Sequence, residues 1–193
     1  MCVGQGQRVI MDSLGMASFQ GKMSDVQVAL AAGADPDEAA FEWNGTVGGT
    51  WTATYLAARH NHPIVLAYMV GEEGGADPNK RGSLIGMPCH VACRYGHDKC
   101  VGVLLTAGAD PNIANNNGLT PCMFAAFGDS VACLRALREG GPGGSFTSVN
   151  AVATGGNWGG KTALDLALIH ICRCRRPTPA RLRGAPRHSH KKH

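Results

Sequence analysis

Apolar residues recur at helical spacing along most of this chain, in short runs separated by glycine, proline, asparagine and aspartate. The clearest stretch is residues 87–112. Pro88 suits the first turn of a helix, and Gly96 predicts its end because glycine adopts the left-handed cap conformation at little cost. A second run begins at Asp98 and places Val101, Leu104 and Leu105 on one face. The pattern predicts two short helices joined back to back.

One helix pair cannot bury its apolar face alone, and the chain repeats it. Gly-Ala-Asp-Pro followed by Asn or Asp occurs at 33–37, 75–79 and 108–112, and a weaker echo lies at 148–150. Gly108 follows Gly75 by 33 positions. Related helix starts occur at 87–92 and 120–125, with looser variants at 52–58 and 162–167. Period and motif together resemble the ankyrin-repeat family, whose signature is T-P-L-H-x-A.

The resemblance implies an all-α solenoid in which helix–turn–helix units are joined by finger loops. We expect four to five repeats within residues 14–171, with units at about 14–37, 52–79, 87–112, 120–141 and 162–171. We further expect residues 1–13 to be an N-terminal segment and residues 172–193 a disordered, basic tail rich in Pro, Arg and His. The fifth unit has one helix, from Thr162 to about Ile171. Either its outer face is open to a partner, or the chain is a fragment or altered end of a larger ankyrin protein.

Two irregularities interrupt the repeat. Asp35 and Thr52 are 17 positions apart, whereas Asp110 and Thr120 are 10 apart. The longer finger carries Trp43 and is either a partner contact or a loop folded over the first unit. If Gly128 is the counterpart of Gly96, unit four is also one residue short before it. Its second helix then fits two alignments, which bury Leu134 and Leu137 or Cys133 and Leu137.

The sequence predicts an intracellular protein. No run approaches the roughly 18 apolar residues of a membrane span, and the first residues do not form a signal peptide. We therefore expect an intracellular, cytoplasmic protein, with nuclear location as an alternative suggested by the basic tail. Five cysteines fall on apolar or small positions of the repeat, where a reduced thiol acts as a small hydrophobe, so we expect no metal site: Cys89, Cys93, Cys100, Cys122 and Cys133.

Charge is distributed unevenly. Residues 1–171 carry 14 acids and 10 Lys and Arg, and the tail from Cys172 carries eight Lys and Arg without an acid. The basic tail has three open interpretations: contact with nucleic acid, contact with another acidic surface, or an inert solvated end. It contains no aromatic residue on which a base could stack.

Residues 155–162 match the phosphate-loop pattern G-x4-G-K-[ST]. In such a loop Lys161 would reach the outer phosphate and Thr162 would ligate Mg²⁺. The same residues also suit the start of an ankyrin helix with Thr162 as its cap. A nucleotide hydrolase further needs a parallel sheet and a second carboxylate, and the only acid after Lys161 is Asp165. We expect no cofactor and no enzymatic activity, and keep nucleotide binding as an alternative.

The resemblance places partner contacts on the concave face, at the finger tips and at the ends of the first helices. Aromatic residues and arginine, which anchor interfaces, recur there. Ser83 is a further finger position. The candidate partner-binding residues are Trp51, Arg59, His60, Leu84, Arg94, Tyr95, Asn116, Asn117, Leu119, Phe127, Trp158 and Lys161.

Three histidines receive structural roles from the same resemblance. Met87 replaces the threonine that normally partners the signature histidine, so His90 needs another partner, for which a backbone group of the next finger is a candidate. His62 and His97 lie in the turns between helices, where the family's histidine ties adjacent units together. The sequence thus favours a non-catalytic module that binds another protein of unknown identity.

Overall fold

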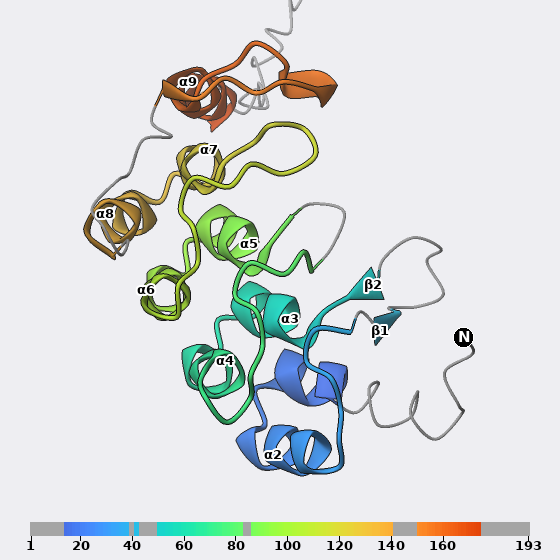
Figure 1. Ribbon diagram of the computed structural model, residues 1–193. Helices are drawn as coiled ribbons and strands as arrows, with labels where there is room; N and C mark the ends of the chain where they lie inside the picture. The colour runs from blue at the N-terminus through green and yellow to red at the C-terminus, as the bar shows by residue number, and fades with distance from the viewer. Residues whose placement is uncertain (1–13, 39–40, 43–49, 83–85, 141–149, 175–193) are drawn as a thin grey trace, which may run out of the picture.

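The computed structural model describes residues 14–38, 41–42, 50–82, 86–140 and 150–174. These residues form stacked helix pairs, as the sequence predicts (Figure 1). The inner column contains the helix over residues 14–20, α3 (Ala53–Arg59), α5 (Pro88–Tyr95), α7 (Pro121–Phe127) and α9 (Ala163–Cys174). The outer column contains α2 (Met23–Ala31), α4 (Pro63–Val70), α6 (Asp98–Thr106) and α8 (Val131–Gly140). No described helix has the length and apolar content to cross a bilayer.

The enlarged finger before α3 contains a feature that the all-α prediction did not include. Strands β1 (Phe41–Glu42) and β2 (Thr50–Trp51) pair in antiparallel fashion, with Phe41 opposite Trp51. Figure 1 shows this pair on the same side of the helices as the other finger loops. It places Trp51 immediately before α3. The tip of the finger, including Trp43, lies outside the described residues.

The turns between inner and outer helices share one left-handed position. It is occupied by Asn61, Gly96 and Asp129, whose φ angles are 59°, 77° and 53°. Asp129, rather than Gly128, is therefore the counterpart of Gly96, and the expected one-residue deficit in unit four is wrong. Gly128 is needed for another reason: a Cβ at this position would clash with the carbonyl oxygen of Arg94.

The corrected register also fixes the second helix of unit four. Cys133 and Leu137 are completely buried in α8, whereas Leu134 is half-buried. The first of these corresponds to Cys100 of α6, which is buried at the same place one unit earlier. Of the two alignments left open by the sequence, the one that buries Cys133 and Leu137 is confirmed.

The Gly-Ala-Asp-Pro motif joins neighbouring units through hydrogen bonds. In each copy the aspartate carboxylate accepts the N–H two residues later, as Asp77 does from Asn79 at 2.8 Å. The last residue of the motif then bridges to the next unit. The Asp37 carboxylate accepts the Asp77 N–H at 3.0 Å, and Asn79 Oδ1 accepts the Asp110 N–H at 2.9 Å. The repeated motif is therefore a ladder between units.

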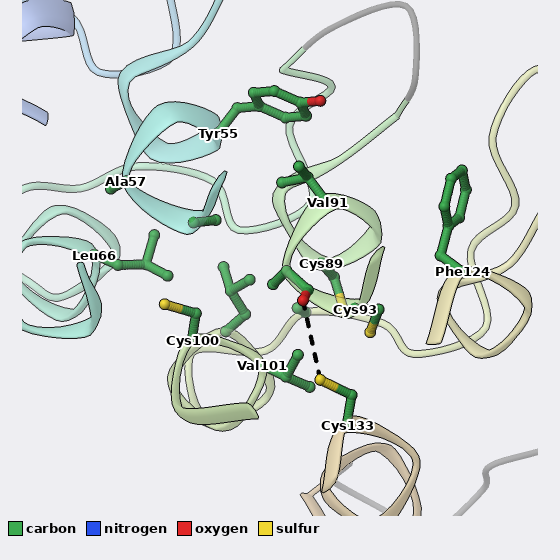
Figure 2. Packing of buried hydrophobic residues seen from close by; sticks show 14 of the residues in the cluster. Tyr55, Ala57, Leu66, Cys89, Val91, Cys93, Cys100, Val101, Phe124 and Cys133 are labelled. Atoms are coloured by element: carbon green, nitrogen blue, oxygen red, sulfur yellow. Dashed lines mark hydrogen bonds between the residues drawn. The ribbon is translucent and has the colours of Figure 1, made fainter. Parts of the chain in front are cut away.

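The core runs without interruption from the first unit to α9 and consists largely of aliphatic side chains and cysteines. Figure 2 shows Cys89, Cys93, Cys100 and Cys133 among these side chains, with the Cys133 thiol 3.9 Å from the Ala92 carbonyl oxygen. Burial raises the pKa of Cys100 to about 12 and that of Cys122 to about 11. The thiols at these two positions stay protonated and pack as small hydrophobes, as expected.

The last described helix, α9, continues to Cys174 and so is longer than the sequence suggested. Its inner side packs on α7 through Ala163 and Leu166, which are buried. Leu164 and Leu168 are 70% and 51% exposed. Within the described residues, α9 has no outer helix of its own.

Candidate functional site

The C-terminal ends of the inner helices carry an alternation of arginine and aromatic residues. Arg59, the last residue of α3, contacts two rings, with its Cζ atom 5.5 Å from the centroid of Trp51 and 5.2 Å from that of Tyr95. Trp51 comes from β2 and Tyr95 is the last residue of α5. These distances fall within the range of cation–π contacts. Three side chains that the sequence placed on the concave face are thus brought together.

The next unit repeats this contact. Arg94 of α5 lies with its Cζ atom 5.2 Å from the ring centroid of Phe127, the last residue of α7. Phe127 meets Trp158 edge to face, with centroids 5.7 Å apart. The direction of the Phe127 side chain, which the apparent deficit before Gly128 obscured, is therefore toward the concave row. We call Trp51, Arg59, Tyr95, Arg94, Phe127 and Trp158 the arginine–aromatic row.

A pocket of about 340 Å³ opens at one end of this row. Its walls come from α5, α7, α9 and two finger loops, and we call it the α7–α9 pocket. Arg94 and Asn117 supply polar groups, and the apolar wall includes Phe124, Phe127 and Trp158. The volume lies near the lower end of the range of small-molecule sites and has room for one large side chain.

The repeat geometry and the row can now be compared with known proteins. A family model described as ankyrin repeats in three copies matches residues 14–115 and again residues 89–175. The chain belongs to the ankyrin-repeat family. Ankyrin repeats are generally protein–protein interaction modules and are typically non-catalytic.

Two curated proteins are similar to this ankyrin chain. Target of rapamycin complex 2 subunit AVO2 of Saccharomyces cerevisiae is 26% identical over 146 residues, which cover 76% of this chain and 32% of that protein. The E3 ubiquitin-protein ligase KEG of Arabidopsis thaliana is 32% identical over 93 residues, covering 48% of this chain and 5% of the ligase. The matches thus cover about a third of one relative and a twentieth of the other.

Two histidines join adjacent ankyrin units, and one of them also contacts the arginine–aromatic row. His97 stacks on Tyr95 with ring centroids 6.1 Å apart, and its Nε2 atom lies 3.1 Å from the carbonyl oxygen of Arg59. His62 Nε2 lies 2.9 Å from the carbonyl oxygen of Phe19 in the unit before. Both histidines therefore tie adjacent units together, as predicted. The contact of His97 also fixes Tyr95 relative to Arg59.

His90, at the signature position of the third unit, binds the finger loop that carries Leu119, a residue of the pocket wall. Its Nδ1 atom accepts the Met87 N–H at 3.3 Å, and its Nε2 atom lies 3.0 Å from the Leu119 carbonyl oxygen. The expected partner in the next finger is confirmed. Because Nδ1 is an acceptor, the neutral ring carries its proton on Nε2 and donates it to Leu119. Burial lowers the pKa of His90 to about 4.

The other predicted contact residues differ in exposure. Asn116, Asn117 and Lys161 are exposed at the fingers, and His60 is half-buried with its ring 4.2 Å from that of Phe19. Leu119 is only 7% exposed and packs in the core. It also lines the α7–α9 pocket, so a contact with a partner at this position would be made from inside the pocket. Ser83 and Leu84 lie outside the described residues.

The sequence analysis missed residues that complete the pocket. Asn115 is buried, and its Oδ1 atom accepts the N–H groups of Asn117 and Leu119 at 2.9 and 3.0 Å. It thereby shapes the finger that forms one wall. Phe124 lies within the helix motif at 120–125 and received no role of its own. For Asn115 the signal was the turn Asn115-Asn116-Asn117-Gly118, which marks a loop without saying which asparagine points inward.

Residues 155–162 do not form a phosphate cradle. The N–H groups of Gly155, Gly160 and Lys161 donate to the carbonyl oxygens of Asn117, Ala153 and Trp158. The Thr162 N–H and hydroxyl both donate to the Asp165 carboxylate at 2.9 Å. A phosphate loop needs these groups for its ligand. Here they join two fingers and cap α9, which explains the glycine-rich pattern by the repeat itself.

The charge of the concave side is positive at the inner helices. Among the described side chains of α3, α5, α7 and α9, the charged residues are Arg59, Arg94 and Asp165, since buried His90 is neutral. The Asp165 carboxylate is occupied by Thr162. No described carboxylate lies within ion-pair distance of either arginine. The ion pair among the described residues joins Arg138 to Glu139 at the outer helix α8.

Proposed function

We propose that this ankyrin domain is a non-catalytic protein-binding module that holds a partner against its concave face. The observation that carries the proposal is the arginine–aromatic row, in which Arg59 and Arg94 repeat the same contact in successive units. Tyr95 is 46% exposed although it is a large aromatic residue. Tyrosine, tryptophan and arginine are the residue types that dominate interface energetics.

The row is also preorganised. Each arginine is held over a ring, and Tyr95 is supported by His97, which itself binds the carbonyl oxygen of Arg59. Side chains that are ordered before binding lose less conformational entropy when a partner docks. The ring contacts already restrict the conformations of these side chains in the free protein, so less entropy remains to be lost if they form the contact surface.

One of the similar proteins is named as a subunit of a complex, which agrees with a binding role for the shared ankyrin region. That agreement concerns the class of function. The matched region covers 32% or less of each relative, so the partners and activities of those whole proteins are not transferred to this chain.

Affinity capture with matched variants tests the proposal. The concave variant combines Trp51→Ala, Arg94→Ala and Tyr95→Ala. The control combines Gln27→Ala, Glu72→Ala and Lys99→Ala, three exposed positions in or next to outer helices. Both variants must first show wild-type helicity and cooperative unfolding.

Proteins captured by wild type and by the control, but lost from the concave variant, support the concave face as the binding surface. The same set captured by all three proteins counts against it. Quantitative mass spectrometry measures the difference and names the partner.

A further inference from the structure

The concave face also indicates the chemistry of its partner. We propose that it binds an extended, acidic peptide segment whose carboxylates pair with Arg59 and Arg94 and whose large apolar side chain enters the α7–α9 pocket. This inference rests on the proposed function and specifies the partner class of the same surface.

The geometry of the arginines favours carboxylates. The Cζ atom of Arg59 lies over the rings of Trp51 and Tyr95, 5.5 and 5.2 Å from their centroids. Contact of a ring with the face of a guanidinium leaves the N–H groups at the edge of its plane available for hydrogen bonds. Such an edge matches the two oxygens of a carboxylate and forms two parallel hydrogen bonds with it. The ring contacts hold the fork in position before the ligand arrives.

The electrostatic surroundings favour the same ligand. The described carboxylate of the inner helices, Asp165, is bound to Thr162, and neither Arg59 nor Arg94 has an acidic partner among the described residues. A basic segment would be repelled by both arginines. An acidic segment would supply the charge that the face lacks, and attraction of this kind accelerates association at low salt.

The spacing of the arginines sets the spacing of the acids. Arg59 and Arg94 occupy the ends of neighbouring inner helices, and packed helices lie about 8–10 Å apart. An extended chain in the polyproline II conformation advances about 3.1 Å per residue and returns to the same face every third residue, so two carboxylates roughly three residues apart reach the two forks. In an α-helix, which rises about 1.5 Å per residue, acids at this spacing would lie closer together than the arginines are.

The pocket supplies the third contact. Arg94 lies at its rim over Phe127, so the carboxylate bound to Arg94 and the apolar anchor are close neighbours in the ligand. The wall of Phe124, Phe127 and Trp158 favours an aromatic or large aliphatic anchor, and Asn117 offers polar groups beside it. The motif therefore has two acids followed or preceded by one large apolar residue next to the acid that pairs with Arg94.

Selection from a library of randomised twelve-residue peptides displayed on phage tests this motif with the full chain as bait. We expect enrichment of peptides that carry two Asp or Glu about three positions apart and one Trp, Phe, Leu or Met beside one of them. A synthetic, fluorescein-labelled copy of an enriched peptide is then titrated with wild type and variants by fluorescence polarisation.

Arg94→Gln removes the charge and keeps much of the stem, and we expect it to weaken binding about tenfold or more. Arg94→Lys restores charge without the fork and should recover only part of the loss. Lys99→Gln, on the outer helix α6, removes the same charge elsewhere and should leave affinity within about twofold. Replacing the apolar anchor of the peptide by Ala should also weaken binding about tenfold.

Enriched peptides without acids, or with affinity that Arg94→Gln leaves unchanged, would overturn the acidic motif. Failure to enrich any peptide would also overturn it. Such an outcome would leave the broader proposal intact if the concave variant still failed to capture a folded partner that wild type binds. If no acidic peptide is enriched and the concave variant captures the same proteins as wild type, the concave face itself is rejected as the binding surface.

Discussion

The Nε2–H of His90 in α5 donates a hydrogen bond of 3.0 Å to the carbonyl oxygen of Leu119 in the next finger loop. On the other side of the ring, Nδ1 accepts the Met87 N–H. Protonation of Nδ1 would turn this acceptor into a donor facing another donor, in a site where the side chain is 1% exposed. The neutral imidazole is therefore part of the folded structure.

This arrangement predicts a loss of stability in mild acid. The pKa of His90 is lowered to about 4 in the folded chain, whereas an unfolded histidine titrates near about 6.5. Between these values the unfolded state binds the proton and the folded state does not, so stability falls as pH falls from about 6.5 to about 4. At about pH 4.5 the contribution of His90 should have decreased by about 2–3 kcal/mol.

Urea unfolding of wild type and His90→Gln at about pH 7 and about pH 4.5, followed by circular dichroism, measures this effect. Glutamine retains a donor for Leu119 and does not titrate. The loss of unfolding free energy on acidification should be smaller in the variant by about 2–3 kcal/mol. Equal losses in the two proteins would show that His90 is not the titrating group.

Much of the fold was predictable from the sequence because the same packing problem is solved in each unit. The Gly-Ala-Asp-Pro motif, Gly96 and the spacing of Val101, Leu104 and Leu105 define one helix pair, and the 33-residue period transfers it to the next. The β1–β2 pair was not predictable, since two residues per strand give no alternation. The inward position of Leu119 depends on the Asn115 turn, which pattern alone does not orient.

The arginine–aromatic row was predictable only in part. The family resemblance placed Arg59, Arg94 and Tyr95 on one face, but a contact between successive units depends on the distance between helices as well as on sequence position. Phe127 was correctly placed among the concave-face residues, but the direction of its side chain was in doubt because Gly128 looked like the cap glycine. The structure assigns the left-handed residue to Asp129, which as a short polar residue tolerates this conformation better than most.

The assignment of Asp129 can be tested by substitution. At φ 53° an alanine is strained, whereas glycine is not. We expect Asp129→Gly to raise the free energy of unfolding by a few tenths to about 1 kcal/mol, and Asp129→Ala to lower it by about 1 kcal/mol. Gly96→Ala, at the corresponding position of the third unit, should behave like Asp129→Ala. If Asp129→Ala were as stable as Asp129→Gly, the register of unit four would be wrong.

Two leucines test the extent of the core. Leu104 of α6 is completely buried, whereas Leu164 of α9 is 70% exposed. Leu104→Ala removes buried methyl groups and leaves a cavity, so it should cost about 2–5 kcal/mol. Leu164→Ala should cost less than about 0.5 kcal/mol. A large loss from the second substitution, measured by urea unfolding, would mean that something covers Leu164 in solution.

The hydrogen bonds between neighbouring units can also be tested by substitution. Asn79 Oδ1 accepts the Asp110 N–H at 2.9 Å, and its Nδ2 atom donates to the Gly108 carbonyl oxygen at 3.1 Å. Asn79→Ala loses both bonds and should destabilise the chain by about 1 kcal/mol. Asn116→Ala, at an exposed finger position, is the control and should change stability by less than about 0.5 kcal/mol.

Asn79→Asp separates the two bonds of this ladder, because a carboxylate keeps the acceptor and loses the donor. The chain already uses an aspartate in this role: the Asp37 carboxylate accepts the Asp77 N–H. Burial raises the pKa of Asp37 above its usual value, which shows that the charged form is disfavoured there. A carboxylate at position 79 would also lie between Asp77 and Asp110.

We therefore expect Asn79→Asp to be less stable than wild type at low salt and to recover toward it at high salt, while Asn79→Ala gains nothing from salt. Urea unfolding at the two salt concentrations measures this. A salt-independent loss in Asn79→Asp would place the cost in the missing donor to Gly108 rather than in charge repulsion.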